Sequence, residues 1–220
     1  MARRPDMALA ADRARALALT PVSRETAERL DAFVELLLLW QQRTNLIAPS
    51  TIERIWTRHV ADSLQLVELA PAARTWVDLG SGAGFPGLVI ACAVAETAGA
   101  HVDLVESNAK KAAFLREAAR VTRAPAAVHA MRIENFVQNV RERPDVVTAR
   151  ALAPLKSLFE LAFPLLRGVL GVFPKGQDVD VELTQATKYW KFEASLVPSK
   201  TSPEGRIVLV RGLERREISR

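Results

Sequence analysis

Residues 77–87 have the sequence VDLGSGAGFPG, in which a short apolar run gives way to a glycine-rich turn. The apolar run, which begins at Trp76, predicts a buried strand because turn-forming residues bound it. Glycines at 80, 82 and 84 let the backbone turn sharply and approach a ligand without a side chain in between. Pro86 suits the first turn of a helix. The stretch therefore predicts a strand–turn–helix unit with a ligand site at the turn.

Strand and helix patterns alternate from this point to the C-terminal region. The expected strands are 76–79, 101–106, 126–130, 146–149, 168–174, 192–197 and 206–211, and the main helices follow Pro86 and cover 107–121, 155–166 and 178–187. Such alternation predicts a mostly parallel sheet covered by helices on both faces, and the final hairpin adds one antiparallel strand. Seven strands with one reversed is the arrangement of the Rossmann-like class I S-adenosylmethionine methyltransferase fold.

The chain reads as a single domain over residues 1–220, because no repeat or low-complexity linker divides it. Residues 1–22 are rich in Ala and Arg without a periodic apolar face, which predicts a flexible extension. Residues 23–70 predict N-terminal helices, the first capped by Ser23 and the second opened by a capping box at residues 50–53. The Rossmann-like core is expected at 74–213.

The composition of the chain limits the compartment in which it can work and the partners that it can bind. Cys92 is the only cysteine in 220 residues, which excludes an internal disulfide and a multi-cysteine zinc site, and it favours the cytoplasm. The longest apolar run, residues 88–95, is too short to span a membrane. A net charge of +5 favours an anionic partner such as RNA, although free use of arginine explains it equally well. We expect a monomer with no metal and no membrane partner.

Two carboxylates accompany the glycine-rich turn. Glu106 closes the second strand, where it can accept both ribose hydroxyls of a nucleoside. Asp78 lies within the turn, where an anion would oppose a pyrophosphate but favour a cationic methionine moiety. Gly82 belongs to a Gly-x-Gly-x-x-Gly pattern that also matches dinucleotide-binding enzymes, so a dehydrogenase is the main competitor. A third possibility is that the glycines only form an ordinary tight turn between a strand and a helix.

Three further positions are ambiguous from the sequence. Ile133 and Glu134 follow the third strand, where they could flank an adenine, but Glu134 would equally suit the first turn of a helix. His59 and Asp62 lie on one helix face, and a structural pair supporting the turn is favoured over a catalytic dyad. Cys92 lies in an apolar run and is expected to be a buried small hydrophobic residue.

Several segments together resemble the ribosomal RNA small-subunit methyltransferase G family, also called glucose-inhibited division protein B. They are Trp40 with Asn45-Leu46, His59-x-x-Asp62-Ser63, residues 78–87, Glu106-Ser107 with Lys111, Arg132-Ile133-Glu134, Arg150-Ala151 and Lys175-Gly176. The turn ending at Gly87, combined with Arg150-Ala151 and Lys175-Gly176, is specific. Residues 1–20 have no counterpart in the family pattern, and Ile47 stands where the family often has Thr.

The resemblance implies S-adenosylmethionine-dependent methylation of the 7-nitrogen of one guanine in 16S ribosomal RNA, near the decoding centre of the small ribosomal subunit. Naked RNA, a subunit precursor and the assembled subunit stay open as substrates. By matched position, the implied cofactor contacts are Gly80, Phe85, Ile133, Glu134 and Arg150. Asp78, Gly82 and Glu106 are added on the physical grounds given above.

Methylation of the 7-nitrogen of guanine is consistent with the catalytic motifs that the sequence lacks. The 7-nitrogen of guanine carries a lone pair and no proton, so its methylation needs no general base. The fourth strand is followed by Ala151-Leu152-Ala153-Pro154 instead of the Asn-Pro-Pro-aromatic motif of exocyclic-amine methyltransferases. No residue is a certain catalyst, and Arg150 is the candidate for positioning guanine. Lys175 and Arg206 are candidates for RNA contacts, or simply solvated strand ends.

Overall fold

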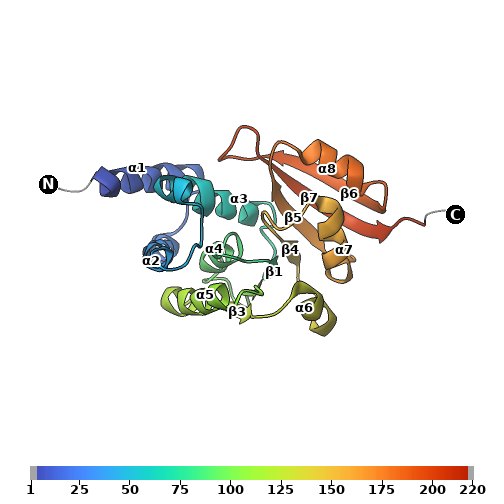
Figure 1. Cartoon of the computed structure of the whole chain (residues 1–220), viewed down its shortest axis with the longest axis horizontal. Helices are drawn as coiled ribbons and strands as arrows, with labels where there is room; N and C mark the ends of the chain where they lie inside the picture. The colour runs from blue at the N-terminus through green and yellow to red at the C-terminus, as the bar shows by residue number, and fades with distance from the viewer. Residues whose placement is uncertain (1–3, 218–220) are drawn as a thin grey trace.

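The computed structural model describes residues 4–217, and its centre is a seven-stranded sheet in the order β3-β2-β1-β4-β5-β7-β6 (Figure 1). The strands are β1 (Thr75–Leu79), β2 (His101–Val105), β3 (Ala126–His129), β4 (Val146–Thr148), β5 (Leu170–Lys175), β6 (Trp190–Pro198) and β7 (Arg206–Arg215). The pairs from β3 through β5 are parallel, and β7 is antiparallel to both β5 and β6. The predicted class I methyltransferase topology is confirmed.

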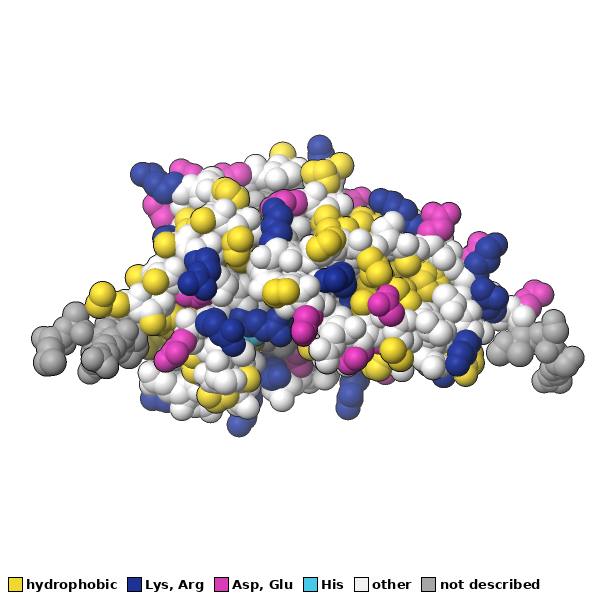
Figure 2. Space-filling model, turned by 90° about the horizontal axis from the view of Figure 1, so that it is seen from above, with side chains coloured by type: hydrophobic (Ala, Val, Ile, Leu, Met, Phe, Trp, Pro, Cys, Tyr) yellow, Lys and Arg dark blue, Asp and Glu magenta, His cyan; other side chains and the backbone are white. Residues whose placement is uncertain are grey.

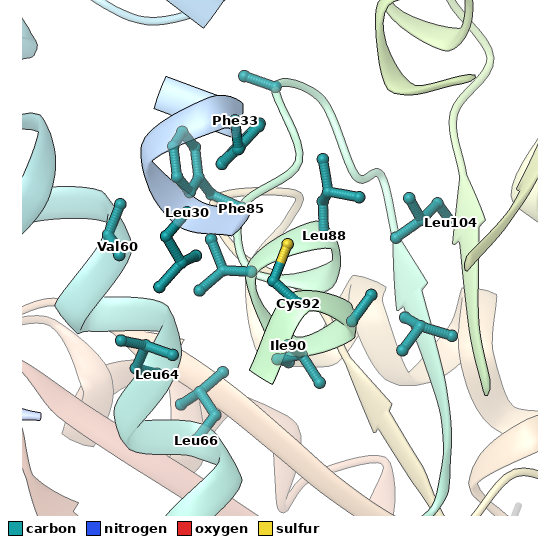
Figure 3. Close-up of a cluster of buried hydrophobic side chains, with 14 of the residues drawn as sticks. Leu30, Phe33, Val60, Leu64, Leu66, Phe85, Leu88, Ile90, Cys92 and Leu104 are labelled. Carbon is teal, nitrogen blue, oxygen red and sulfur yellow. The ribbon is translucent and has the colours of Figure 1, made fainter. Parts of the chain in front are cut away.

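Helices cover both faces of this sheet. They are α2 (Arg24–Gln41), α3 (Asp62–Glu68), α4 (Gly87–Ala93), α5 (Ala109–Thr122), α6 (Ile133–Asn139), α7 (Leu155–Leu166) and α8 (Val179–Ala186). Neighbouring strand residues point to opposite faces, so Trp76 joins the apolar cluster with α2, α4 and α5, whereas Val77 joins the one with α6, α7 and α8. Figure 3 shows the first cluster, in which side chains from α2 and α4 interlock, Cys92 among them.

The N-terminal segment differs from the flexible extension predicted for residues 1–22. Helix α1 (Arg4–Leu19) packs against the helical segment η2 (Trp56–Ala61), and Ala16 is fully buried. Asp12, which is also buried, accepts hydrogen bonds from the backbone N–H groups of Trp56 and Thr57. The carboxylate therefore satisfies free donors at the start of η2, which fixes α1 in place. Residues 1–3 of the predicted extension lie outside the described residues.

The second N-terminal helix also departs from expectation. The chain forms a 3-10 turn η1 (Pro49–Arg54), the π-helix η2 and then α3, in place of one regular helix. Ser23 caps α2 as predicted, but the capping box at residues 50–53 is wrong, because the N-cap of η1 is Ala48 and makes no side-chain cap bond. The π-helix matters for the site because it contains His59 and leads directly into Asp62.

The terminal hairpin is longer than predicted, and its turn is fastened to α3. The side-chain oxygen of Gln65 accepts a hydrogen bond from the backbone N–H of Lys200, and Asp62 accepts one from the hydroxyl of Thr201. These contacts bring the turn between β6 and β7 beside the carboxyl ends of β4 and β5. Among residues 4–217, no helix has the length and apolar character needed to cross a membrane.

Candidate active site

The glycine-rich turn follows β1, and its backbone has the conformation that the glycines predict. Gly80, Gly82 and Gly84 have φ values of 71°, 54° and 89°, which other residues rarely adopt. The N–H groups of Gly80 and Ser81 both donate to the carbonyl of Val105 at the end of β2, at 2.9 and 3.0 Å. The turn is thereby anchored to the neighbouring strand, at the carboxyl edge of the sheet where ligands of such folds bind.

Asp78 is fully buried beneath the turn. Its Oδ2 accepts a hydrogen bond from the backbone N–H of Gly87 at 3.0 Å, whereas its Oδ1 is buried without a partner among the described residues. A Cβ at position 87 would lie 2.5 Å from Oδ2, so only glycine allows this approach. Burial raises the pKa of Asp78 to about 7, because desolvation disfavours the carboxylate. A cation placed beside Oδ1 would stabilise the charged form.

Glu106 lies just beyond β2 and is bonded to the turn. Its Oε2 accepts from the N–H of Gly82 at 2.9 Å, and its Oε1 accepts from the N–H of Asn108 at 2.7 Å. Each carboxylate oxygen can accept a second hydrogen bond, so both remain able to take a ribose hydroxyl. The backbone thus orients Glu106 for the role that the sequence predicts.

Ile133 and Glu134 stand in the first turn of α6, the position that the structural alternative gives to Glu134. Ile133 is half-buried and packs against the apolar cluster with α6 and α7, and Glu134 is exposed. A contact of either residue with adenine stays a prediction.

These residues fit the nucleoside and methionine parts of S-adenosylmethionine. At Gly82 a Cβ would meet no side chain, which leaves room for a ligand to approach the backbone there, Glu106 offers acceptors to a ribose, and the unpaired Oδ1 of Asp78 suits a cationic ligand. A pyrophosphate would instead bring two negative charges towards Asp78, which disfavours the dinucleotide alternative.

Arg150 follows β4, and its partners differ from those anticipated. The sequence offered an ion pair with Glu106 or Asp78 as the structural alternative, but the guanidinium pairs with Asp62 at 3.3 Å. It also donates to Nδ1 of His59 at 2.7 Å and lies over the ring of Phe85, 5.3 Å from the ring centre. The predicted pairing of His59 with Asp62 is therefore indirect, because both residues hold Arg150.

A cavity of about 730 Å³ opens beside Arg150. Its wall combines η2, the loop after β4, the end of β5 and the hairpin turn. The lining residues are Arg58, His59, Asp62, Arg150, Ala151, Leu152, Ala153, Pro154, Pro174, Lys175, Gly176, Gln177, Glu182, Ser199, Ser202, Glu204, Gly205, Arg206 and Ile207. Viewed from above, the molecule has a row of Lys and Arg side chains with part of a histidine beneath them (Figure 2). The cavity has the size and mixed character of a nucleotide pocket.

Lys175 and Arg206 both line this cavity, but they are less free than solvated strand ends. The ammonium of Lys175 donates to the carbonyl of Ala153 and pairs with Glu182, both at 2.7 Å, and only 10% of its side chain is exposed. Arg206 donates to the carbonyls of Pro203 and Gly205 within the hairpin turn. Both residues therefore shape the wall of the cavity, and their contact with RNA stays a prediction.

Other members of the site carried no signal in the sequence. Thr51 contacts His59, Thr201 contacts Asp62 and Glu182 pairs with Lys175, from positions up to 139 residues away along the chain. A threonine or glutamate in an exposed-looking segment has no motif to mark it. Cys92 is buried as predicted, and burial raises the pKa of its thiol to about 12, which keeps it unreactive.

The sequence of this chain matches a known protein family. A family model described as rRNA small subunit methyltransferase G matches residues 26–208. The ribosomal RNA small subunit methyltransferase G of a Bradyrhizobium species is 60% identical over 208 residues, which cover 94% of each chain. The protein of the same name from Rhodopseudomonas palustris is 58% identical over 216 residues, 98% of this chain and 92% of the relative.

Solved structures with distant sequences share the fold. A methyltransferase from Podospora anserina, bound to SAH, aligns with a TM-score of 0.60 at 13% identity and covers 87% of this chain and 97% of its own. An O-methyltransferase from Bacillus cereus in complex with SAH aligns with a TM-score of 0.58 at 15% identity, over 94% and 99% of the two chains.

Proposed function

The chain belongs to the rRNA small subunit methyltransferase G family, and we infer that it methylates the 7-nitrogen of a guanine in 16S ribosomal RNA with S-adenosylmethionine as donor. The observation that carries this proposal is the junction of two sites. The glycine turn with Asp78 and Glu106 fits the donor, and Arg150, which lies over Phe85 of that turn, also lines a cavity large enough for a nucleotide.

The residues at this junction match the demands of the reaction. S-adenosylmethionine, when bound, supplies an electrophilic methyl group. The 7-nitrogen of guanine presents its lone pair without losing a proton, so the protein need not provide a base. Its task is to align donor and acceptor, which contributes up to about 7–11 kcal/mol in favourable cases. A rigid turn and a fixed guanidinium perform this task better than a titrating group would.

Arg150 is proposed to position the guanine. Arginine pairs well with the oxygen and nitrogen acceptors on the edge of guanine that carries the 7-nitrogen, and it also binds phosphate. Methylation leaves the base cationic, so the guanidinium cannot favour the product through charge. Arg150 therefore acts through geometry, and Gly80 and Phe85 beside it are proposed to contact the cofactor.

Two alternatives use the same geometry, namely a methyltransferase of small molecules and a non-catalytic nucleotide-binding module. Calorimetry separates the module from an enzyme when S-adenosylmethionine is compared with nicotinamide dinucleotides. We expect binding of the former alone, and absence of that binding would favour the module. Binding of rRNA should weaken with the logarithm of salt concentration at a slope of roughly −0.7 for each phosphate contacted, whereas a small acceptor would show little change.

The setting of the reaction is likewise proposed. A small-subunit RNA substrate implies that the enzyme works in the cytoplasm. We propose that Arg58, Lys175 and Arg206, which line the cavity, contact phosphates of the RNA backbone. No separate RNA-binding domain is apparent in residues 4–217, so an assembled RNA surface is expected to supply part of the recognition. We propose that the enzyme acts as a monomer.

A further inference from the structure

We propose that His59 is a positioning residue, a neutral hydrogen-bond acceptor that fixes the direction of the Arg150 guanidinium on the wall of the cavity described above. This inference rests on the proposed function. It assigns a task to a histidine that neither binds the cofactor in the account above nor takes a proton in the reaction. A chain of hydrogen bonds with a single consistent direction runs through His59.

The chain begins at a backbone carbonyl. The hydroxyl of Thr51 donates to the carbonyl of Ala48 at 2.7 Å, so its oxygen can accept from the ring of His59, whose Nε2 lies 2.9 Å away. This assigns the proton of the neutral imidazole to Nε2. Nδ1 is then left with a lone pair, and Arg150 donates to it at 2.7 Å. Each step fixes the next, from the backbone of η1 to the guanidinium.

His59 must stay neutral for this arrangement to hold, because a protonated ring has no acceptor. Burial and the positive charges of Arg150 and Arg58 lower the pKa of His59 to about 3. The anion that faces the same guanidinium is Asp62, which pairs with its other terminal nitrogen. The carboxylate therefore balances the charge of Arg150, and the imidazole sets its direction without adding a second charge.

The ring also limits where the guanidinium can lie. His59 stacks on Phe85 with ring centres 4.9 Å apart, and Arg150 lies over the same phenylalanine. The terminal nitrogens of Arg150 are used by His59, Asp62 and the carbonyl of Arg58. Its Nε–H has no hydrogen bond to any residue in 4–217, so this donor is not used by the contacts that hold the guanidinium.

Two amide substitutions, each of which keeps a polar group near one of the ring nitrogens, test the proposal. The side-chain oxygen of His59→Asn can replace Nδ1 as the acceptor for Arg150, whereas His59→Gln places its amide near the former Nε2 and loses that acceptor. Both variants lose the ring that stacks on Phe85, so they are matched for packing. Single-turnover methylation of small-subunit rRNA is measured at saturating RNA and S-adenosylmethionine, with the unfolding temperature of each variant recorded.

We expect His59→Gln to lower the rate about tenfold, the size typical of a lost hydrogen bond to a charged group, with KM for RNA little changed. His59→Asn should stay within about threefold of the wild type at a similar unfolding temperature. In an Arg150→Ala background, His59→Gln should have no further effect. Equal losses in the Asn and Gln variants, or additive losses with Arg150→Ala, would overturn the proposal.

A further variant guards against misfolding of the histidine variants. Thr51→Val removes the hydroxyl that fixes the imidazole proton while leaving the ring, so the rate should fall by about threefold to fivefold, and an unchanged rate would count against the chain of bonds. Failure of the wild type to form 7-methylguanine would instead refute the proposed function. The variants therefore test the role of His59, and the wild-type sample of the same experiment tests the proposed function.

Discussion

The backbone N–H of Gly87 donates a hydrogen bond to Oδ2 of Asp78 at 3.0 Å, which closes the glycine-rich turn against the strand that precedes it. The start of α4 is thereby tied to β1, and the second oxygen of the buried carboxylate is left without a partner. A buried unpaired oxygen is unfavourable in the free protein. A cationic ligand would offset that cost, so this carboxylate links stability to cofactor binding.

Asp78→Asn tests that link through cofactor affinity. The pKa of Asp78 is raised to about 7, so the carboxylate becomes charged as the pH rises through 7, and affinity for cationic S-adenosylmethionine should rise with it. The Asn variant should bind at least tenfold more weakly at pH 8 and lose this rise between pH 6 and 8. Isothermal calorimetry at several pH values measures both effects, and an unchanged pH dependence would contradict the assignment.

The same substitution should stabilise the ligand-free protein. A folded-state pKa above the ordinary value of 3.8 means that the folded state binds the proton more tightly, so stability falls as the pH rises from about 4 to 7. Asp78→Asn removes this penalty, and we expect a higher unfolding temperature than the wild type at pH 8 and little difference at pH 4. Equal unfolding temperatures of the variant and the wild type at both pH values would show that the buried carboxylate does not lower the stability.

The sequence alone predicts the sheet and the cofactor edge well. The glycine turn, Asp78 and Glu106 lie within or directly after strands, so the strand order brings them together. The surroundings of Arg150 were not predictable in this way. Asp62 and His59 lie about 90 residues before it along the chain, and Thr201 lies 51 residues after it. The contact between α1 and the start of the π-helix uses Asp12, a single buried carboxylate that no local pattern marks.

Asp12 therefore offers a test of the N-terminal helix. Asp12→Ala removes the acceptor for two backbone N–H groups at the start of η2, and we expect a loss of about 2 kcal/mol in the free energy of unfolding. Because η2 carries His59, methylation activity should fall as well. Urea denaturation measures the stability, and Asp12→Asn, which keeps one acceptor oxygen, should lose less. A wild-type unfolding curve for Asp12→Ala would mean that α1 does not support the site.

Arg58 is an exposed cation on the wall of the cavity and tests the RNA footprint. If it contacts one phosphate, Arg58→Ala should reduce the salt slope of RNA binding by roughly 0.7. Lys191→Ala is the matched control, because Lys191 is 75% exposed on β6 and is not among the residues that line the cavity. Fluorescence anisotropy between 50 and about 200 mM salt covers the useful range. Equal slopes for the three proteins would exclude Arg58 from the footprint.

Arg150 is the residue proposed to align the target guanine with the methyl donor. Arg150→Ala should lower the single-turnover methylation rate by at least tenfold, and Arg150→Lys should restore little, because an ammonium cannot reproduce the forked geometry that His59 and Asp62 hold. Rapid-quench measurement with methyl-labelled S-adenosylmethionine gives the rate directly. A rate equal to that of the wild type in Arg150→Ala would remove this residue from the mechanism.

The central claim is the identity of the methylated atom, and mass mapping of 16S ribosomal RNA tests it most directly. RNA from cells that lack the gene is compared with RNA from the same cells complemented with the wild-type or the Asp78→Asn gene. We predict that one 7-methylguanosine disappears on deletion, returns fully with the wild-type gene and returns less with the variant. A full complement of 7-methylguanosine in the deletion strain would contradict the proposed function.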